Sequence, residues 1–113
     1  MVFQAIGLMS GTSLDGLDIC LAKFEKQNST WKFEIIKAET LSYSEHWENQ
    51  LRNSIHLSAE ELLELHSEYG FFLGKAVKNF ISKYNLFIHY FVIASLIRLK
   101  SCSLISMTPS RNR

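Results

Sequence analysis

The sequence predicts an α/β fold in which an antiparallel three-stranded meander is followed by two helices. Residues 2–41 contain three runs of β-forming residues separated by polar turns, whereas residues 45–83 carry apolar residues at helical spacing. The 113 residues suit one small domain with a modest core. The net charge of +1 favours neither nucleic acid nor an anionic membrane surface as a partner.

Two apolar runs predict the first two strands. Val2 to Met9 and Leu17 to Phe24 are rich in β-formers, and they flank a polar segment with the hairpin signal Asp15-Gly16. In the second run every other residue is a large aliphatic, while the opposite face is only partly polar. We therefore expect this strand to lie inside a covered sheet rather than in a solvated ribbon.

A third strand is predicted after the polar turn at residues 25–30. Trp31, Phe33 and Ile35 alternate with charged residues, which predicts a strand with one wet face that ends near Leu41. The neighbouring pair of isoleucines at 35 and 36 breaks the alternation. A β-bulge near the end of the strand would account for this break.

The first helix is predicted from about Glu45 to His56. Ser42 and Glu45 match a capping box. Apolar residues then recur every four positions on one helical face, at Trp47, Leu51 and Ile55.

The second helix is predicted from Ala59 to about Lys83, because Ser58 and Glu61 form another capping box ahead of the longest periodic segment. The apolar stripe of this helix comprises Leu62, Leu65, Tyr69, Phe72, Leu73, Ala76 and Phe80. We expect the stripe to pack in the core. Gly70 and Gly74 lie together on one side of the helix, where they leave room for a neighbouring backbone.

The segment from Met9 to Asp18 has chemistry that points to a reaction. Its ten residues include two glycines, three hydroxyls and two carboxylates. Glycines let backbone N–H groups approach a ligand, and successive N–H groups form a concavity that suits an anion. Because Asp15 and Asp18 would repel a bare phosphate, a phosphate site here needs Mg²⁺ between the carboxylates and the phosphate oxygens. On composition alone, an ordinary hairpin with a polar tip stays open.

The sequence Met-Ser-Gly-Thr-Ser-Leu-Asp-Gly-Leu-Asp at 9–18, after a strand that ends in Ile-Gly-Leu, resembles the opening signature of the anhydro-N-acetylmuramic acid kinases. The resemblance implies a partial lobe of the actin, hexokinase and Hsp70-like ATPases, whose first hairpin holds the nucleotide phosphates. It implies ATP and Mg²⁺ as cofactors. The ATP-binding residues that it implies are Gly11, Thr12, Ser13, Leu14, Asp15, Gly16, Leu17 and Asp18.

The resemblance also implies a cytoplasmic kinase of cell-wall recycling. Such an enzyme opens 1,6-anhydro-N-acetylmuramic acid with water and phosphorylates it to N-acetylmuramic acid 6-phosphate, and at full length it is expected to form a homodimer. Two cysteines without a metal-ligand spacing or a disulfide framework fit a reducing cytoplasm. The family's general-base aspartate is expected beyond residue 113, so no catalytic residue is assigned here. Because the kinase needs two lobes, we expect residues 1–85 to form the N-terminal part of one lobe and the chain alone to be inactive.

The composition changes after Asn85. Residues 1–85 hold all eleven acidic residues and eight of the twelve basic ones, whereas residues 86–113 hold four basic residues and no acidic one. The resemblance implies a strand leading into His-Gly-Gln-Thr, a motif that this tail lacks. A change of reading frame near residues 85–90 would explain a tail outside the family pattern. An authentic divergent end and an amphipathic or membrane-associated tail stay open, although the apolar run at 86–99 is short for a membrane span.

A second class of function also stays open. The chain suits a small non-enzymatic interaction module, because three strands and two helices leave much apolar surface to cover. In such a module the hairpin tip is an ordinary loop and the long helix is a docking face.

Overall fold

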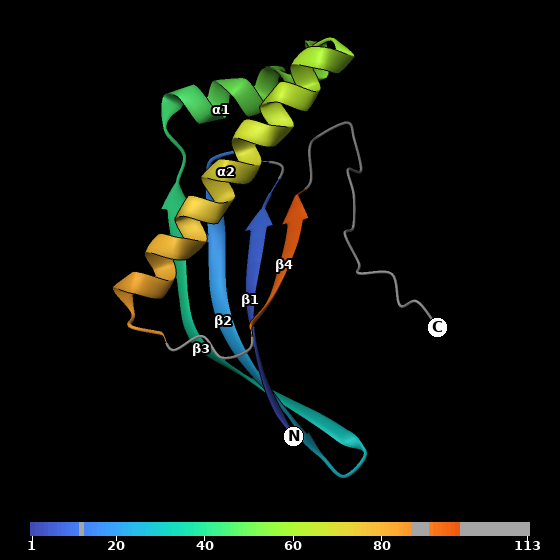
Figure 1. Ribbon diagram of the computed structural model, residues 1–113, viewed down its shortest axis with the longest axis vertical. Helices are drawn as coiled ribbons and strands as arrows, with labels where there is room; N and C mark the ends of the chain where they lie inside the picture. The colour runs from blue at the N-terminus through green and yellow to red at the C-terminus, as the bar shows by residue number, and fades with distance from the viewer. Residues whose placement is uncertain (12, 87–90, 98–113) are drawn as a thin grey trace.

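A four-stranded sheet is crossed on one face by a long helix in the computed structural model (Figure 1). The structure describes residues 1–11, 13–86 and 91–97, with side chains in the first two of these ranges. The strands are β1 (Val2–Ser10), β2 (Gly16–Gln27), β3 (Thr30–Ser42) and β4 (Phe91–Ile97). The helices are α1 (Glu45–Arg52), the short 3₁₀ helix η1 (Asn53–His56) and α2 (Ala59–Lys83).

The order of strands in the sheet is β3-β2-β1-β4. β1 pairs with β2 and β2 with β3, both antiparallel, so the meander followed by two helices is confirmed. β4 adds a parallel partner on the other side of β1, with Ala5 opposite Val92. A parallel pair needs a crossover connection, and the segment between β3 and β4, which contains α2, provides it. The result is consistent with a partial ATPase-like α/β lobe.

β3 contains the predicted bulge. Leu21 of β2 faces Lys37, whereas the next residue, Ala22, faces Ile35, so Ile36 is the extra residue. The bulge lies in the middle of β3 and not near its end, because the strand continues in register to Ser42 opposite Gly16. The alternation of side chains between the two faces of the sheet therefore shifts by one residue halfway along β3.

The capping box proposed at Ser42 is wrong. Ser42 is the last residue of β3, and its backbone is paired with Gly16 in the sheet. The hydroxyl of Ser44 caps α1 instead, accepting a hydrogen bond from the Trp47 N–H at 3.3 Å. The predicted helix begins at Glu45 as expected, but its last turn, from Asn53, is 3₁₀.

α2 has the predicted bounds and begins with the predicted capping box. The Glu61 N–H donates to the Ser58 Oγ at 3.3 Å, and the Ser58 N–H donates to the Glu61 Oε2 at 2.8 Å. This backbone hydrogen bond lowers the pKa of Glu61 from its usual value. An N-cap of this kind contributes about 1 kcal/mol to helix stability.

The core lies between α2 and one face of the sheet. The predicted stripe of α2 is buried or half-buried, and Phe80 is 1% exposed. The sheet residues in this core are Ile6, Leu8, Leu17, Ile19 and Leu21. Burying one such side chain contributes about 1.5–3 kcal/mol. β2 lies between two other strands of the sheet, as predicted. Within the described residues, however, only the face of the sheet that carries this core is covered.

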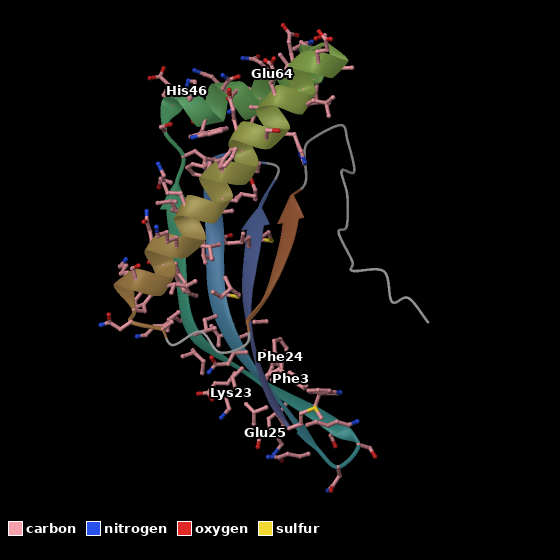
Figure 2. The ribbon with its side chains drawn as sticks, in the orientation of Figure 1. Phe3, Lys23, Phe24, Glu25, His46 and Glu64 are labelled. Carbon is pink, nitrogen blue, oxygen red and sulfur yellow. The ribbon has the colours of Figure 1, made fainter. Side chains whose placement is uncertain are left out.

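Figure 2 shows the side chains at the end of the sheet that lies away from α1. There Phe3 and Phe24 extend past α2 and are 46% and 36% exposed. Among the described residues, no helix has the length and apolar character needed to cross a membrane.

Candidate functional site

The segment with the kinase-like signature connects β1 to β2 at the end of the sheet where α1 begins (Figure 1). Gly11, Ser13, Leu14 and Asp15 belong to the connecting loop, while Thr12 lies outside the described residues. The remaining residues of the predicted set, 16–18, are the first three of β2. The connection is therefore a five-residue loop rather than a tight turn centred on Asp15-Gly16.

Leu14 holds an unusual backbone conformation in this loop. Its φ of 56° lies in the left-handed region, which costs a side chain other than glycine or asparagine about 1–2 kcal/mol. Its N–H donates to the Gly11 carbonyl at 3.3 Å, and its side chain is buried in the core. Burial of the leucine side chain thus offsets the backbone strain and fixes the loop on the sheet.

Gly16 is required for space rather than for a left-handed backbone. No described glycine has a positive φ. A Cβ added at Gly16 would lie 2.9 Å from the carbonyl oxygen of Leu41 and 3.3 Å from the Thr40 Cγ2. The glycine therefore lets β3 approach the base of the loop.

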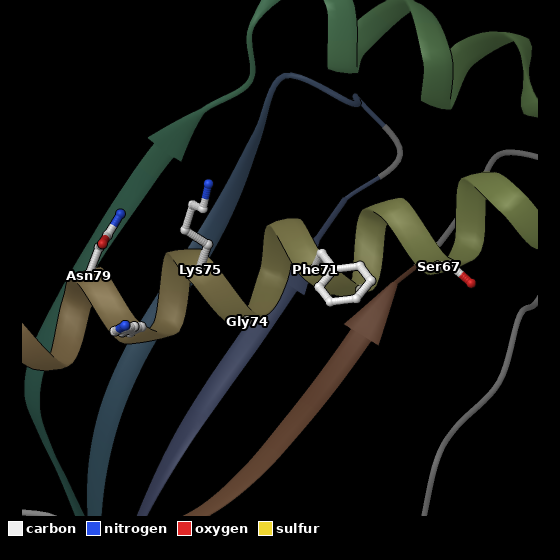
Figure 3. A pocket seen from close by; sticks show the side chains of 7 residues that line it. Ser67, Phe71, Gly74, Lys75 and Asn79 are labelled. Carbon is white, nitrogen blue, oxygen red and sulfur yellow. The ribbon is translucent and has the colours of Figure 1, made fainter.

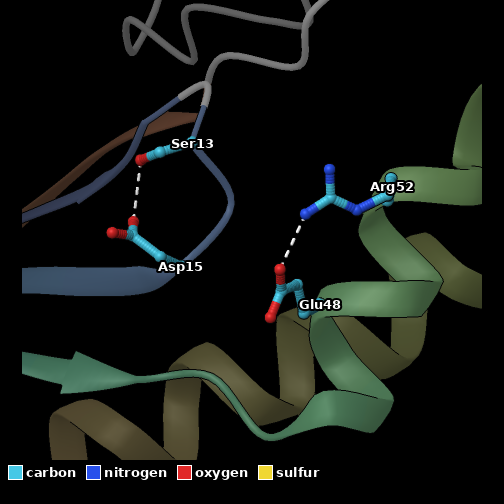
Figure 4. Close-up of polar contacts among 4 residues, drawn as sticks. All are labelled: Ser13, Asp15, Glu48 and Arg52. Atoms are coloured by element: carbon cyan, nitrogen blue, oxygen red, sulfur yellow. Dashed lines mark hydrogen bonds and ion pairs between the residues drawn. The ribbon is translucent and has the colours of Figure 1, made fainter.

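The two carboxylates of the segment are exposed and each is bonded to a hydroxyl. The Ser13 Oγ donates to the Asp15 Oδ1 at 2.7 Å (Figure 4), and the Thr40 Oγ1 donates to the Asp18 Oδ1 at 2.6 Å. Mg²⁺ is often held by one or two carboxylates together with substrate phosphates. Among the described residues, no group of three acidic, histidine or cysteine side chains is placed to hold a metal ion by itself.

Tyr43 holds the two ends of the loop by hydrogen bonds. Its N–H donates to the Asp15 carbonyl at 3.0 Å, and its hydroxyl donates to the Ser10 Oγ at 2.8 Å. The hydroxyl also shares a hydrogen bond of 2.5 Å with that of Tyr69 on α2. Burial raises the pKa of Tyr43 above its usual value, so it stays a neutral hydrogen-bonding group.

Tyr43 was not among the residues predicted from the sequence. One signal could have found it, because this aromatic residue lies directly between the end of a strand and the N-cap of a helix. That position brings its ring against the core, where it packs on Tyr69 and Phe72.

Ser13 and Asp15 of the loop are exposed to solvent. α1 carries an exposed ion pair between Arg52 and Glu48 with N···O 2.7 Å (Figure 4). Two surface hollows of the described chain, one on α2 and one along α1, contain no residue from the loop.

The fold and this hairpin define an α/β lobe of ATPase-like type. Residues 3–94 match the family model of anhydro-N-acetylmuramic acid kinase. The match contains the whole loop between β1 and β2 and most of the chain, so the chain belongs to the anhydro-N-acetylmuramic acid kinase family.

Individual relatives agree with this assignment. The chain is 33% identical over 84 residues to an anhydro-N-acetylmuramic acid kinase of Pseudoalteromonas translucida, covering 72% of this chain and 21% of the relative. It is 33% identical over 87 residues to that of Clostridioides difficile, covering 74% and 23%. For that of Francisella tularensis subsp. novicida the identity is 32% over 84 residues, covering 72% and 22%. The chain thus spans about a fifth of the length of these relatives.

Proposed function

We propose that residues 11–18 bind the phosphates of ATP, with Mg²⁺, as part of a kinase acting on 1,6-anhydro-N-acetylmuramic acid. The observation that carries this proposal is the buried, left-handed Leu14 at the centre of the family's signature. Strained backbone persists where the surrounding structure enforces it, and such strain clusters at ligand-binding loops. An ordinary hairpin has no need of it, because cheaper turns are available.

Each residue of the segment has a distinct role in the proposal. Gly11 leaves space for a phosphate beside the backbone, and the Thr12 hydroxyl donates a hydrogen bond to it. The Ser13 hydroxyl exchanges its hydrogen bond to Asp15 for one to the phosphate. Asp15 and Asp18 hold water molecules of a phosphate-bound Mg²⁺. The buried Leu14 and Leu17, with the close approach at 16, hold this surface in place.

For the complete enzyme we propose the reaction that the relatives' name indicates, phosphorylation of anhydro-N-acetylmuramic acid. Water adds at C1 of the anhydro sugar as the C1–O6 bond breaks, and O6 takes the γ-phosphoryl group of ATP, which leaves as ADP. The product is N-acetylmuramic acid 6-phosphate, formed in the cytoplasm during cell-wall recycling. Phosphoryl transfer depends on positioning and charge stabilisation from several sides of the transferred group. Because the loop supplies one wall, we propose that the 113-residue chain has no turnover by itself.

Nucleotide binding tests the proposal directly. The ³¹P resonances of Mg-ATP should broaden on addition of the chain, most strongly for the β and γ phosphates. Gly11→Val should abolish the broadening, because a Cβ at Gly11 has room in the fold, its nearest contact being the Ser13 Oγ at 3.9 Å, but occupies the approach to the loop. Ser29→Val at the other turn is the matched control and should leave the broadening unchanged. Equal broadening by all three proteins would contradict the proposal.

Turnover tests the second part. Incubation with ATP, Mg²⁺ and the anhydro sugar should give no phosphorylated sugar above a Gly11→Val background. Detectable product above that background would show that the chain alone completes the site.

The boundary at residue 85 stays a prediction. β4 lies wholly beyond residue 85, and the family match, which runs to residue 94, ends beyond it. We propose that a change of reading frame explains the composition of the tail. The coding DNA decides this: another frame after codon 85 should encode His-Gly-Gln-Thr, and its absence from both alternative frames would refute the frame change.

A further inference from the structure

The buried hydroxyls of Ser10, Tyr43 and Tyr69 form a chain of hydrogen bonds behind the loop between β1 and β2. The three residues are 1%, 8% and 6% exposed, and they come from β1, from the link between β3 and α1, and from α2. Ser10 directly precedes Gly11, so the chain of hydroxyls ends at the first residue of the loop. A helix that contributes no residue to the loop is thereby bonded to the loop's support.

The direction of these hydrogen bonds follows from the number of protons. A phenol hydroxyl carries one proton, and that of Tyr43 is donated to the Ser10 Oγ at 2.8 Å. The Tyr69 hydroxyl is therefore the donor in its 2.5 Å contact with the Tyr43 oxygen. Hydrogen bonds aligned in one direction polarise and strengthen one another, so the proton that Tyr69 supplies strengthens the bond to Ser10.

Tyr43 passes this support to both ends of the loop. Its hydroxyl bonds to Ser10 before the loop, and its N–H donates to the Asp15 carbonyl at 3.0 Å after it. Between these two points the buried Leu14 keeps a backbone φ of 56°, in the left-handed region. The position of Tyr43 therefore sets how the two ends of the loop are spaced, and with it the backbone that Leu14 adopts.

The ring of Tyr69 is held by aromatic neighbours. It is stacked on Phe72, with centroids 6.0 Å apart, and packs against Trp47 of α1 at 5.6 Å and Tyr43 at 6.4 Å. Figure 3 shows α2 lying across the strands with Phe71 on its exposed side. Tyr69 is two residues earlier, roughly 200° around the helix, and so faces the sheet. With its ring locked in this way, the Tyr69 hydroxyl stays directed at Tyr43.

We propose that Tyr69 is a positioning residue of the nucleotide site, which acts through Tyr43 and Ser10 to hold residues 11–15 in their phosphate-binding shape. A side chain that only fills the core has no need of a hydroxyl, and Phe72 and Phe80 fill the same stripe of α2 without one. The inference rests on the proposed function for its ligand, ATP, but the shape of the loop is measurable without that ligand.

Amide hydrogen exchange of the full 113-residue chain, followed by NMR, tests the positioning in the absence of nucleotide. In Tyr69→Phe the Leu14 amide, which is bonded to the Gly11 carbonyl, should exchange at least about fivefold faster than in the parent. The Tyr43 amide, bonded to the Asp15 carbonyl, should be accelerated as well. Unchanged exchange at Leu14 would overturn the proposal.

Two controls separate positioning from a general loss of stability. The Lys26 N–H, bonded to the Met1 carbonyl at 3.1 Å near the far end of the sheet, should keep its exchange rate in Tyr69→Phe. Tyr84→Phe removes a half-buried hydroxyl bonded to Glu39 at 2.9 Å and should leave the loop amides unchanged. Equal acceleration at Lys26 and at the loop in Tyr69→Phe would mean that the hydroxyl stabilises the fold as a whole, which would also overturn the proposal.

Mg-ATP titration tests whether the hydroxyls act as one unit. The parent, Tyr43→Phe, Tyr69→Phe and the double variant are compared at a temperature where all four are folded. Tyr69→Phe should raise the Kd of Mg-ATP about five- to tenfold, and Tyr43→Phe by at least as much. Because Tyr69 acts through Tyr43, the double variant should bind no more weakly than Tyr43→Phe alone. Effects that multiply in the double variant would contradict the proposal.

Failure of the proposed function and failure of this inference give different results. A parent chain that binds no Mg-ATP would contradict the proposed function, while the exchange rates would still show whether Tyr69 shapes the loop. If Tyr69→Phe does not fold, Ser10→Ala removes the acceptor at the other end of the hydroxyl chain and should likewise accelerate exchange at Leu14. An unchanged Leu14 rate in that folded variant would overturn the inference.

Discussion

The two hairpin turns of the meander are built very differently. β2 and β3 are joined by two residues, and the left-handed position, with φ 57°, is taken by Asn28, a residue that tolerates it. β1 and β2 are joined by five, and the left-handed position, with φ 56°, is taken by the buried Leu14. The first loop thus departs from the least costly solution available to the same chain, and it is also the loop with the family signature.

The support beneath the two turns differs as well. The first loop is held by Tyr43, which bonds to Ser10, Asp15 and Tyr69. The second turn is exposed and lies beyond the end of α2 (Figure 1). This difference indicates that the shape of the first loop is specified, whereas the second turn only reverses the chain.

The largest expected effect comes from removing the anchor. Tyr43→Phe deletes one hydroxyl and leaves those of Ser10 and Tyr69 buried without it, so we expect a loss of about 2–3 kcal/mol in the free energy of unfolding. Urea unfolding of the full chain measures it. Tyr84→Phe, which removes a half-buried hydroxyl bonded to Glu39, should cost clearly less. Equal losses in the two variants would mean that the loop has no special support.

The next effect concerns the base of the first loop. Gly16→Ala places a Cβ 2.9 Å from the Leu41 carbonyl oxygen, and the resulting shift of β3 should cost about 1–2 kcal/mol. Gly70→Ala is the control, because its Cβ would meet open space within a helix; it should stabilise by about 0.5–1 kcal/mol. Opposite signs in urea unfolding support the account, and a neutral Gly16→Ala would count against it.

A smaller effect separates the two left-handed residues. Leu14→Gly relieves backbone strain but loses a buried side chain, so we expect a net loss of about 1 kcal/mol. Asn28→Gly loses no buried contact and should change stability by no more than a few tenths of a kcal/mol. If Leu14→Gly were stabilising, the packing of Leu14 would not be what holds the loop.

The smallest effect concerns the hydrogen bonds that join Glu39 of β3 to the end of α2, away from both turns. Hydrogen bonds from Lys83, at 2.8 Å, and from Tyr84, at 2.9 Å, hold the pKa of Glu39 below its usual 4.5. A lowered folded-state pKa stabilises the protein at pH above 4.5, and this contribution is lost as the pH falls through the lowered pKa. Thermal unfolding between about pH 6 and pH 3 should therefore show a slightly weaker acid dependence in Glu39→Gln than in the parent. An unchanged dependence would mean that these hydrogen bonds carry no stability.

Local signals predicted most of the fold. The bounds of α2 follow from Ser58, Glu61 and the apolar period, all read within one segment. The bulge at Ile36 follows from a break in alternation within one strand. The features that were predicted wrongly or missed depend on partners distant in the sequence. Ser42 pairs with Gly16 in the sheet and so does not cap a helix, and β4 forms a strand by pairing with β1.

The candidate site was predicted in its position but not in its construction. The signature located the loop, and its glycines and hydroxyls suggested an anion site. The strain at Leu14 and the anchoring by Tyr43 could not be foreseen, because the first is a backbone torsion and the second joins residues 33 positions apart. Both became visible only when β1, β3 and α2 were placed together.

The most direct test of the central claim is a ¹⁵N-edited NMR titration of the full chain with Mg-ATP. The account predicts that the backbone amide resonances of Gly11, Ser13, Leu14 and Gly16 shift with a common saturation curve, while those of Asn28 and Ser29 stay in place. Absence of shifts at the first loop, or equal shifts at both turns, would contradict it.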